Sequence, residues 1–306
     1  MVSLDTVIVG AGPAGITAAI YAKRKGLSLA LITDSLGGQM SKTANIENYP
    51  GYETIGGAEL AGKMKGQLRR LGVEAVLDRV SSVEKSPEGY LVKTQGGRSY
   101  DARSLIIASG SHWREIGVPG EKEFINRGVS YCSTCDAPLF AGMDVAVVGG
   151  GNSAAEAVME LTRLATKIYM IVRSRLKCDQ VTVVKIRQSD KVTVLEGYNV
   201  DKISGGDFVE SITVRSKDGK AETLSVGGVF VEIGLDPNTG FLEGLVKTND
   251  RGEIIVDDHC STSTEGIFAC GDVTSVPQKQ IIVAAGEGAR AAMTAYNYLA
   301  TKKAEL

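Results

Sequence analysis

The sequence predicts an α/β protein of two domains, because one pattern of strand, glycine-rich turn and helix occurs twice. The first copy has the β-branched run Thr6–Val9, the turn "GAGPAG" at Gly10–Gly15 and an alanine-rich helical stretch. The second copy has Val145–Val148, followed by "GGGNSA" at Gly149–Ala154 and another helical stretch. Strand and helix patterns near the C-terminus are typical of a chain that re-enters the first domain. We therefore expect two Rossmann-like three-layer dinucleotide-binding domains, the second inserted into the first.

Each glycine of the first turn has a role in binding a dinucleotide. Gly10 makes the tight turn, Gly12 lets the backbone approach a pyrophosphate, and Gly15 lets the helix pack against the strand. The N-terminus of the helix then favours the anion. A glycine turn can also be purely structural, but its place between a strand and a helix favours cofactor binding. The predicted phosphate-binding residues are Gly10, Gly12, Pro13, Ala14 and Gly15 in the first turn, and Gly149, Gly151, Asn152, Ser153 and Ala154 in the second.

The end of the second strand in each copy distinguishes the two sites. Asp34 and Arg173 each lie 24 residues after the first glycine of their turn. An acid at this place accepts hydrogen bonds from an adenosine ribose, whereas arginine suits a 2′-phosphate. Arg173 and Arg175 therefore favour NADPH over NADH at the second site, although a solvated basic loop would have the same composition.

The segments between and after the two copies are typical of antiparallel strands and of returns to the first domain. Val76–Val83 and Tyr90–Thr94 alternate apolar and polar residues, and the stretch 96–110 is typical of a turn that enters a buried strand. Gly266–Ala269 predicts a short strand. The stretch 277–300 predicts a long terminal helix whose N-terminal end would point at bound cofactor.

We expect the first domain to comprise residues 1–114 and 242–306, and the inserted domain residues 115–241. The chain would cross between them near Trp113–Pro119 and Asp236–Leu242, and each crossing carries a proline. We expect these two crossings to act as hinges.

Composition excludes several classes of function. The formal net charge of the 306 residues is −2 with both signs scattered, so nucleic-acid binding is not expected. Apolar runs such as Val145–Val148 are far too short to cross a bilayer, and the first residues lack the features of a signal peptide. Five cysteines are too few for a disulfide framework. We expect a cytoplasmic protein.

The stretch "SYCSTCDAP" contains Cys132 and Cys135, and Asp136 follows directly. A zinc site would need two further ligands, and no second Cys-x-x-Cys exists, so we expect no metal. A structural disulfide that closes so short a loop would restrain little chain entropy. Cycling between dithiol and disulfide is favoured, and Asp136 is placed to supply or take the proton that thiol chemistry moves. The alternative role for Asp136 is capping a following short helix.

On the strength of these motifs and several others, the whole chain resembles the low-molecular-weight thioredoxin reductases. The resemblance rests on "GAGPAG", "GGQ" at Gly37–Gln39, "IENYPG" at Ile46–Gly51, "CSTCD" and "GGGNSA", and continues in "EIGLDPNT" and "GIFACGDV". It implies FAD at the N-terminal site, a nicotinamide cofactor and the redox disulfide in the inserted domain, and a homodimer. It also implies that electrons pass from NADPH through FAD and the cysteine pair to a thioredoxin- or glutaredoxin-like protein.

The resemblance also implies roles for single residues. Cys135 would lie nearest the flavin, and Cys132 would attack the disulfide of the protein substrate. Gln39 and Asn48 would contact the flavin or its phosphate arm, and Asp272 would bind the ribityl or pyrophosphate region. The other residues assigned to the two cofactor sites are Gln280 and Ile281 against the isoalloxazine, with Gly38, Gly110, Gly271, Lys279, Ile233 and Gly234.

One departure from the family concerns the electron donor. The usual His-Arg-Arg run with a further Arg reads Val172-Arg173-Ser174 here, with Cys178 at the last place. NADH, reduced ferredoxin or a deazaflavin are therefore alternative donors. Part of the chain also resembles the flavoprotein subunit of alkyl hydroperoxide reductase. A ferredoxin–NADP reductase, which needs no cysteine pair, and a flavin-binding redox sensor remain alternative functions.

Overall fold

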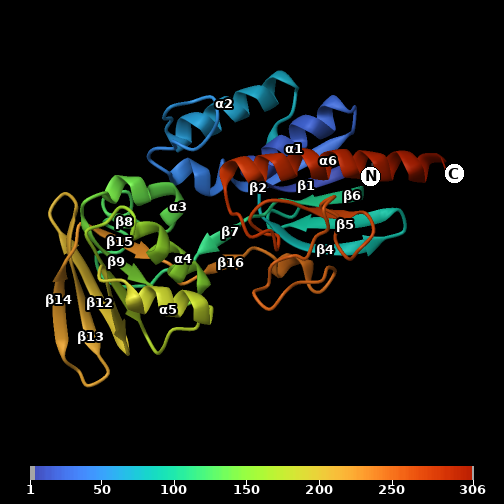
Figure 1. Ribbon diagram of the computed structural model, residues 1–306. Helices are drawn as coiled ribbons and strands as arrows, with labels where there is room; N and C mark the ends of the chain where they lie inside the picture. The colour runs from blue at the N-terminus through green and yellow to red at the C-terminus, as the bar shows by residue number, and fades with distance from the viewer. Residues whose placement is uncertain (1–3, 305–306) are drawn as a thin grey trace. The chain divides into compact units, whose positions relative to one another are not determined.

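The computed structural model describes residues 4–304 and divides into two compact units (Figure 1). The first unit combines the chain up to His112 with the chain from Asp236 onward, and the second is Trp113–Leu235. At the two crossings, β7 (Ser111–Trp113) pairs with β16 (Leu235–Pro237). Among the described residues, no helix combines the length and apolar character that a membrane span needs.

The first unit is built on a seven-stranded sheet. Its strands are ordered β3 (Ala75–Leu77), β2 (Leu29–Leu36), β1 (Leu4–Ala11), β6 (Ser99–Ile107), β5 (Gly89–Thr94) and β4 (Val80–Ser86), and β17 (Ile267–Ala269) also pairs with β6. β6 runs parallel to β1 and β17 but antiparallel to β5. β1, β2 and β6 have long buried apolar runs, as expected of strands covered on both faces.

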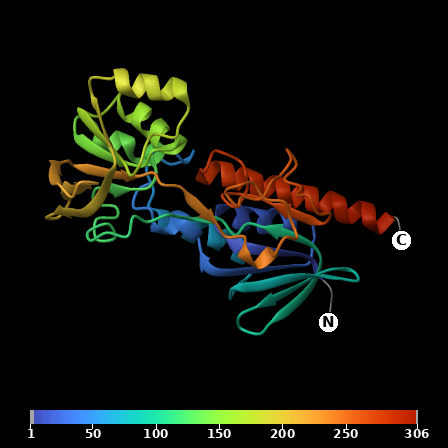
Figure 2. The ribbon, with the colours of Figure 1, turned by 90° about the horizontal axis from the view of Figure 1, so that it is seen from below.

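One face of this sheet is covered by helices α1 (Pro13–Arg24), α2 (Gly57–Arg70) and α6 (Ile281–Ala304). Figure 2 shows α6 beside α1, and small residues explain the close approach. A Cβ on Gly288 of α6 would come within 2.0 Å of the Ala14 carbonyl oxygen. The opposite face buries Val7, Leu105 and Ile107 with apolar residues of β4, β5 and the segment after η3 (Gly240–Leu242).

The second unit has three layers. A parallel sheet is ordered β11 (Val192–Glu196), β10 (Lys167–Val172), β9 (Asp144–Val148), β15 (Gly228–Val231) and β8 (Val129–Ser130). Helices α4 (Asn152–Leu161) and α5 (Gln180–Gln188) cover one face, and an antiparallel sheet of β12 (Tyr198–Gly205), β13 (Val209–Ser216) and β14 (Ala221–Ser225) covers the other (Figure 1). The predicted fold class, two Rossmann-like dinucleotide-binding domains, is confirmed.

Two predicted elements differ from the structure. Val76–Val83 is not one strand, because the chain turns at Asp78 and Arg79, between β3 and β4. The Asp78 carboxylate holds this turn by accepting from the Arg79 and Gly96 backbone N–H groups. The C-terminal helix begins at Ile281 rather than at Pro277, because Lys279 is bonded to the Thr274 carbonyl and to Glu253 instead of entering a helical turn.

Candidate active site

The first glycine turn has the shape that a dinucleotide site needs. Gly10 has φ +100°, and a Cβ on it would lie 2.2 Å from the Ala108 carbonyl oxygen. A Cβ on Gly15 would lie 1.9 Å from the Gly10 carbonyl oxygen, so α1 packs directly on the turn. Gly12, by contrast, would carry a Cβ with nothing within 4 Å. Two glycines are thus required by packing, and the third leaves open space at the N-terminus of α1.

Two segments that are distant in the sequence lie against this turn. η1 (Gly38–Lys42) starts beside it, since a Cβ on Gly38 would lie 3.3 Å from the Gly12 Cα, and the Gly37 N–H donates to the Ala11 carbonyl. A Cβ on Gly271, which has φ +76°, would lie 2.9 Å from the Ala14 Cβ. The structure therefore brings "GGQ" and "ACGD" to the "GAGPAG" turn.

Buried polar atoms near η1 fit a ligand with hydrogen-bonding groups. Gln39 donates through Nε2 to the Ser111 carbonyl at 2.8 Å, while its Oε1 is buried without a partner among residues 4–304. The Ser111 Oγ is likewise buried and unpaired within that part of the chain. Unsatisfied buried groups are costly, so their presence indicates a partner that is supplied from outside the chain. This arrangement fits a flavin.

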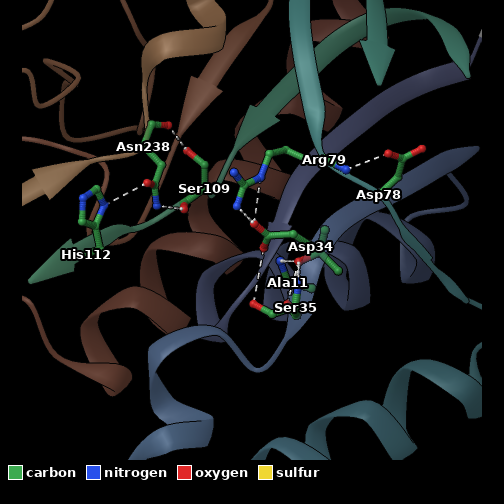
Figure 3. A network of polar contacts seen from close by, with 9 residues as sticks. Ala11, Asp34, Ser35, Asp78, Arg79, Ser109, His112 and Asn238 are labelled. Carbon is green, nitrogen blue, oxygen red and sulfur yellow. Dashed lines mark hydrogen bonds and ion pairs between the residues drawn. The ribbon is translucent and has the colours of Figure 1, made fainter. Parts of the chain in front are cut away.

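Asp34 ends the buried part of β2 and already has a protein partner (Figure 3). Its Oδ2 accepts from Arg79 Nη2 at 2.7 Å and from Nε at 3.2 Å. Both side chains are more than half exposed, so this ion pair contributes little to stability. The contact fixes the direction of the Asp34 carboxylate at the place where the ribose of the cofactor is expected.

Four further residues assigned to the first site have polar or charged side chains: Asn48, Gln280, Asp272 and Lys279. Asn48 donates through Nδ2 to the Gln280 Oε1 at 3.2 Å, which joins the two predicted flavin contacts. Burial raises the pKa of Asp272 despite the positive charge of Lys279. The Lys279 ammonium is itself engaged by Glu253 at 3.1 Å.

Gly110 has φ +67° and lies between Ser109 and His112 in the chain. Both of these neighbours contact Asn238 (Figure 3). Ser109 Oγ donates to the Asn238 carbonyl, Asn238 Nδ2 donates to the Ser109 carbonyl, and His112 Nδ1 lies 3.2 Å from Asn238 Oδ1. The side chain of Asn238 thus fixes the loop that follows β6.

The second glycine turn repeats the first. Gly149 has φ +147°, and a Cβ on it would lie 2.3 Å from the Glu232 carbonyl oxygen and 2.9 Å from the Ala154 Cβ. Gly151 corresponds to Gly12, with nothing within 4 Å of a Cβ. The side chain of Asn152 accepts from the Asp179 N–H at 3.0 Å and so holds the loop that follows β10. This turn also fits a dinucleotide.

Arg173 and Arg175 follow β10 and are exposed. In the part of the chain that the structure describes, no ion pair involves either guanidinium. Hydrogen bonds of the loop's backbone N–H groups hold it instead, since Lys177 N–H donates to the Gly150 carbonyl and Leu176 N–H donates to the Glu196 carboxylate. Two cationic side chains are therefore available beside the second glycine turn.

Ile233 and Gly234 follow β15 in the same unit. Ile233 packs against the apolar cluster between the two sheets. Gly234 has φ +104° and accepts from the Arg114 N–H through its carbonyl at 3.0 Å.

Cys132 and Cys135 form a disulfide with their Cα atoms 5.3 Å apart. Cys132 is the N-cap of the short helix α3 (Ser133–Asp136) and Cys135 lies within it, and the Cys135 N–H donates to Cys132 Sγ at 3.2 Å. Asp136 does not cap the following turn η2 (Ala137–Phe140), because its Oδ2 accepts from Ser130 Oγ at 2.6 Å. Burial raises the pKa of Asp136, and the bond from Ser130 opposes that shift. The pKa of this carboxyl, directly after Cys135, therefore lies above that of an exposed aspartate.

The other cysteines do not join this pair. Cys178, Cys260 and Cys270 are not disulfide-bonded, and the last two are buried. Burial raises the pKa of Cys260 to about 12, so its thiol is inert at neutral pH. Among the described residues, no cluster of three His, Cys, Asp or Glu side chains could hold a metal ion.

Comparisons with known proteins agree with the fold. The profile of the pyridine nucleotide-disulphide oxidoreductases matches residues 4–288. A thioredoxin reductase from Streptococcus pyogenes is 42% identical, with a TM-score of 0.93 over 98% of this chain and 99% of its own. One from Giardia duodenalis is 34% identical, with a TM-score of 0.93 over 98% and 100%.

One subunit of the alkyl hydroperoxide reductase from Escherichia coli is 41% identical over 98% of this chain, which spans only 59% of that relative. The chain thus combines two glycine-rich turns of the kind that bind dinucleotides with a cysteine disulfide, the two features that the name of this family joins. The chain belongs to the pyridine nucleotide-disulphide oxidoreductase family. The resemblance to thioredoxin reductases is confirmed.

Sequence reasoning missed several residues that shape the site. Arg79 holds Asp34, Ser111 adds an unpaired hydroxyl near Gln39, and Ser130 holds Asp136. Glu287 of α6 accepts from the Gly271 N–H at 2.7 Å. Each acts through a contact distant in the sequence or through a common residue type, so no motif marks it.

Substitutions in the first turn should separate cofactor binding from folding. Gly12→Ala should leave the thermal stability of the flavin-free protein unchanged, because its φ is −75° and its Cβ meets nothing, but it should lower the flavin content. Gly15→Ala should destabilise the protein by about 3 kcal/mol, because its Cβ overlaps a carbonyl oxygen. The flavin-to-protein absorbance ratio and thermal unfolding of flavin-free samples test both. Equal flavin retention in Gly12→Ala would contradict this assignment.

Proposed function

We propose that this protein is an NADPH-dependent thioredoxin-disulfide reductase, in which electrons pass through FAD and the Cys132/Cys135 pair to the disulfide of a thioredoxin- or glutaredoxin-like protein. The observation that supports it most is the Cys132–Cys135 disulfide at α3, directly followed by the Asp136 carboxyl, whose pKa is raised by burial. The solved thioredoxin reductases that match nearly the whole chain support the same activity.

The proposed reaction balances as NADPH, a proton and a protein disulfide giving NADP⁺ and a protein dithiol. In the reduced pair, the Cys132 thiolate attacks the substrate disulfide, forms a mixed disulfide and releases one substrate thiolate. Cys135 then attacks Cys132 Sγ, which re-forms the internal disulfide and releases the second substrate thiolate. Asp136 exchanges a proton with these sulfurs. FAD, when bound, supplies the redox group that accepts two electrons from a nicotinamide and passes them to a disulfide.

The residues around the first turn would hold FAD, and those around the second would hold the nicotinamide cofactor. We assign the FAD domain to residues 1–114 and 242–306 and the nucleotide and disulfide domain to residues 115–241, with cofactor contacts as predicted above. We also propose a homodimer that works in the cytoplasm. Sedimentation of the purified protein would test the dimer.

Arg173 and Arg175 support NADPH as the donor because both guanidinium groups are exposed beside the second turn. We expect Arg173→Ala to raise the KM for NADPH about 10- to 100-fold, because the variant loses one or two charge-assisted hydrogen bonds to the 2′-phosphate. The KM for NADH should not rise. Lys220→Ala, which removes an exposed positive charge at the β13–β14 turn, is the matched control. Steady-state kinetics with both nucleotides measure this, and an equal rise for NADPH and NADH would rule out recognition of the 2′-phosphate.

Other donors give different outcomes in one experiment. The oxidised flavin absorbance is followed anaerobically as NADPH, and separately NADH, is added. Bleaching by NADPH alone supports the proposal, and bleaching by NADH alone assigns the site to NADH. If neither bleaches the flavin but dithionite does, the donor is reduced ferredoxin or a deazaflavin. Flavin reduction without any turnover of a thioredoxin disulfide would instead favour a ferredoxin–NADP reductase or a redox sensor.

A further inference from the structure

Glu232 contacts both functional parts of the second unit. It directly follows β15, the strand beside β9 in the parallel sheet (Figure 1). Its N–H donates to the Val148 carbonyl at 2.8 Å, at the end of β9. Its own carbonyl oxygen occupies the space that Gly149 leaves by having no side chain. The backbone of Glu232 is therefore part of the wall of the second glycine turn.

The side chain of Glu232 reaches the redox-active helix. Its Oε1 accepts from the backbone N–H of Ser133 at 3.3 Å. Ser133 is buried and lies between Cys132 and Cys135 in the sequence. The Ser133 nitrogen is bonded to the carbonyl carbon of Cys132, so the carboxyl group is one peptide unit from that cysteine. These contacts all lie within one compact unit, Trp113–Leu235.

The surroundings of Glu232 are acidic. α4 contributes Glu156 and Glu160, and the Arg114 guanidinium lies beside Gly234, two residues after Glu232. Burial raises the pKa of Glu232 to about 7, Glu160 and Glu156 add to the rise, and the Ser133 N–H opposes it. The carboxyl group therefore changes its charge close to neutral pH.

We propose that Glu232 is a positioning residue of the disulfide reaction: it fixes the backbone between the two cysteines against the nucleotide-binding turn, and its charge sets the thiolate fraction of the reduced pair. An anion near a thiol disfavours the thiolate and raises the pKa of that thiol. Ionised Glu232 thus lowers the thiolate fraction of the reduced pair, and protonated Glu232 raises it. This inference rests on the proposed function of the cysteine pair as the reaction centre.

The test measures thiol reactivity rather than turnover. The flavin-loaded protein is reduced with dithiothreitol, freed of reductant anaerobically and treated with iodoacetamide between pH 5 and pH 9. Mass spectrometry of the peptides follows Cys132 and Cys135 separately, and the half-buried Cys178 serves as an internal reference. Glu232→Gln keeps an oxygen that can accept from Ser133 and removes the charge. Glu156→Gln, on the exposed face of α4, removes the same charge without that contact.

We expect Glu232→Gln to speed alkylation of the pair about 3- to 10-fold at pH 7, equivalent to lowering a thiol pKa by half a unit to one unit. The rates should converge at high pH, and Glu156→Gln and Cys178 should change less than about twofold. Unchanged or slower alkylation in Glu232→Gln, or an equal effect of Glu156→Gln, would overturn the proposal.

The wild-type profile gives a second test that needs no variant. The alkylation rate of the wild-type pair, plotted against pH, should require two ionisations, one of them near pH 7. A rate profile that is fitted by the ionisation of a single thiol would also overturn the proposal. Alkylation does not depend on a protein substrate, so a failure of the proposed disulfide reductase activity would be seen separately, in the turnover assay.

Discussion

Replacing Cys135 by Ser should abolish reduction of a protein disulfide and leave reduction of the flavin by nicotinamide intact. The disulfide with Cys132 is the only one among the described residues. Cys260 and Cys270 cannot replace it, since burial raises the pKa values of both thiols well above neutral. We expect turnover with a thioredoxin disulfide to fall by about three orders of magnitude or more, as for the loss of a catalytic nucleophile.

Two assays on the same samples test this expectation. Steady-state thioredoxin reduction measures the full reaction, and anaerobic bleaching of the flavin measures the first half. Cys132→Ser should behave in the same way, while Cys178→Ser, at a half-buried position outside the pair, is the control and should keep full activity. Substantial protein disulfide reduction by Cys135→Ser would mean that electrons leave the protein by another route.

Asp136→Asn should have the next largest effect, lowering turnover by about 10²-fold, the usual contribution of a general acid or base. Burial raises the pKa of Asp136, so the folded protein keeps this carboxyl protonated at a higher pH than an exposed aspartate would. If the proton serves the thiol exchange, wild-type turnover should fall as pH rises through this pKa. That limb of the profile should be absent in Asp136→Asn.

Asp136→Asn should lower turnover but raise the free energy of unfolding at neutral pH. A raised carboxyl pKa stabilises the folded state below the unfolded-state pKa, and this contribution is lost as the pH rises through the folded-state pKa. Asp136→Asn removes the buried charge, so it should be more stable than wild type at neutral pH and should lose that advantage in acid. Chemical denaturation at both pH values measures this. An inactive variant that was also destabilised at neutral pH would point to simple misfolding.

Ser130→Ala provides the control for the pH effect. The Ser130 hydroxyl donates to Asp136 at 2.6 Å and lowers its pKa. Without this bond the pKa should rise further, and the alkaline limb of turnover should move to higher pH. A move to lower pH would be inconsistent with Asp136 as the group that titrates.

Much of this architecture could be predicted from the sequence because its signals are local. Gly10, Gly15 and Gly149 fill backbone positions where a side chain would overlap a carbonyl oxygen, so the turns are visible as motifs. The division of Val76–Val83 into two strands depends on Asp78, whose carboxylate bonds to Gly96 across 18 residues. Alternation of apolar residues continues through this turn and conceals it.

The electrostatic surroundings of the site could not be predicted in the same way. Asp34 and Arg79 are 45 residues apart, and Ser133 and Glu232 are 99 residues apart. Glutamate after a buried strand has no distinctive sequence signature. Its role is visible only once β15 places its carboxyl group against the backbone of α3.

The measurement that tests the central claim most directly is the number of electrons that the protein accepts. Flavin-loaded wild type and Cys135→Ser are titrated anaerobically with dithionite while the flavin absorbance is recorded. A disulfide in electronic contact with the flavin accepts two electrons of its own. We predict that wild type takes up one more two-electron equivalent than the variant before the flavin is fully bleached. Equal uptake by both would show that the Cys132–Cys135 disulfide does not exchange electrons with the flavin, and it would contradict the proposed function.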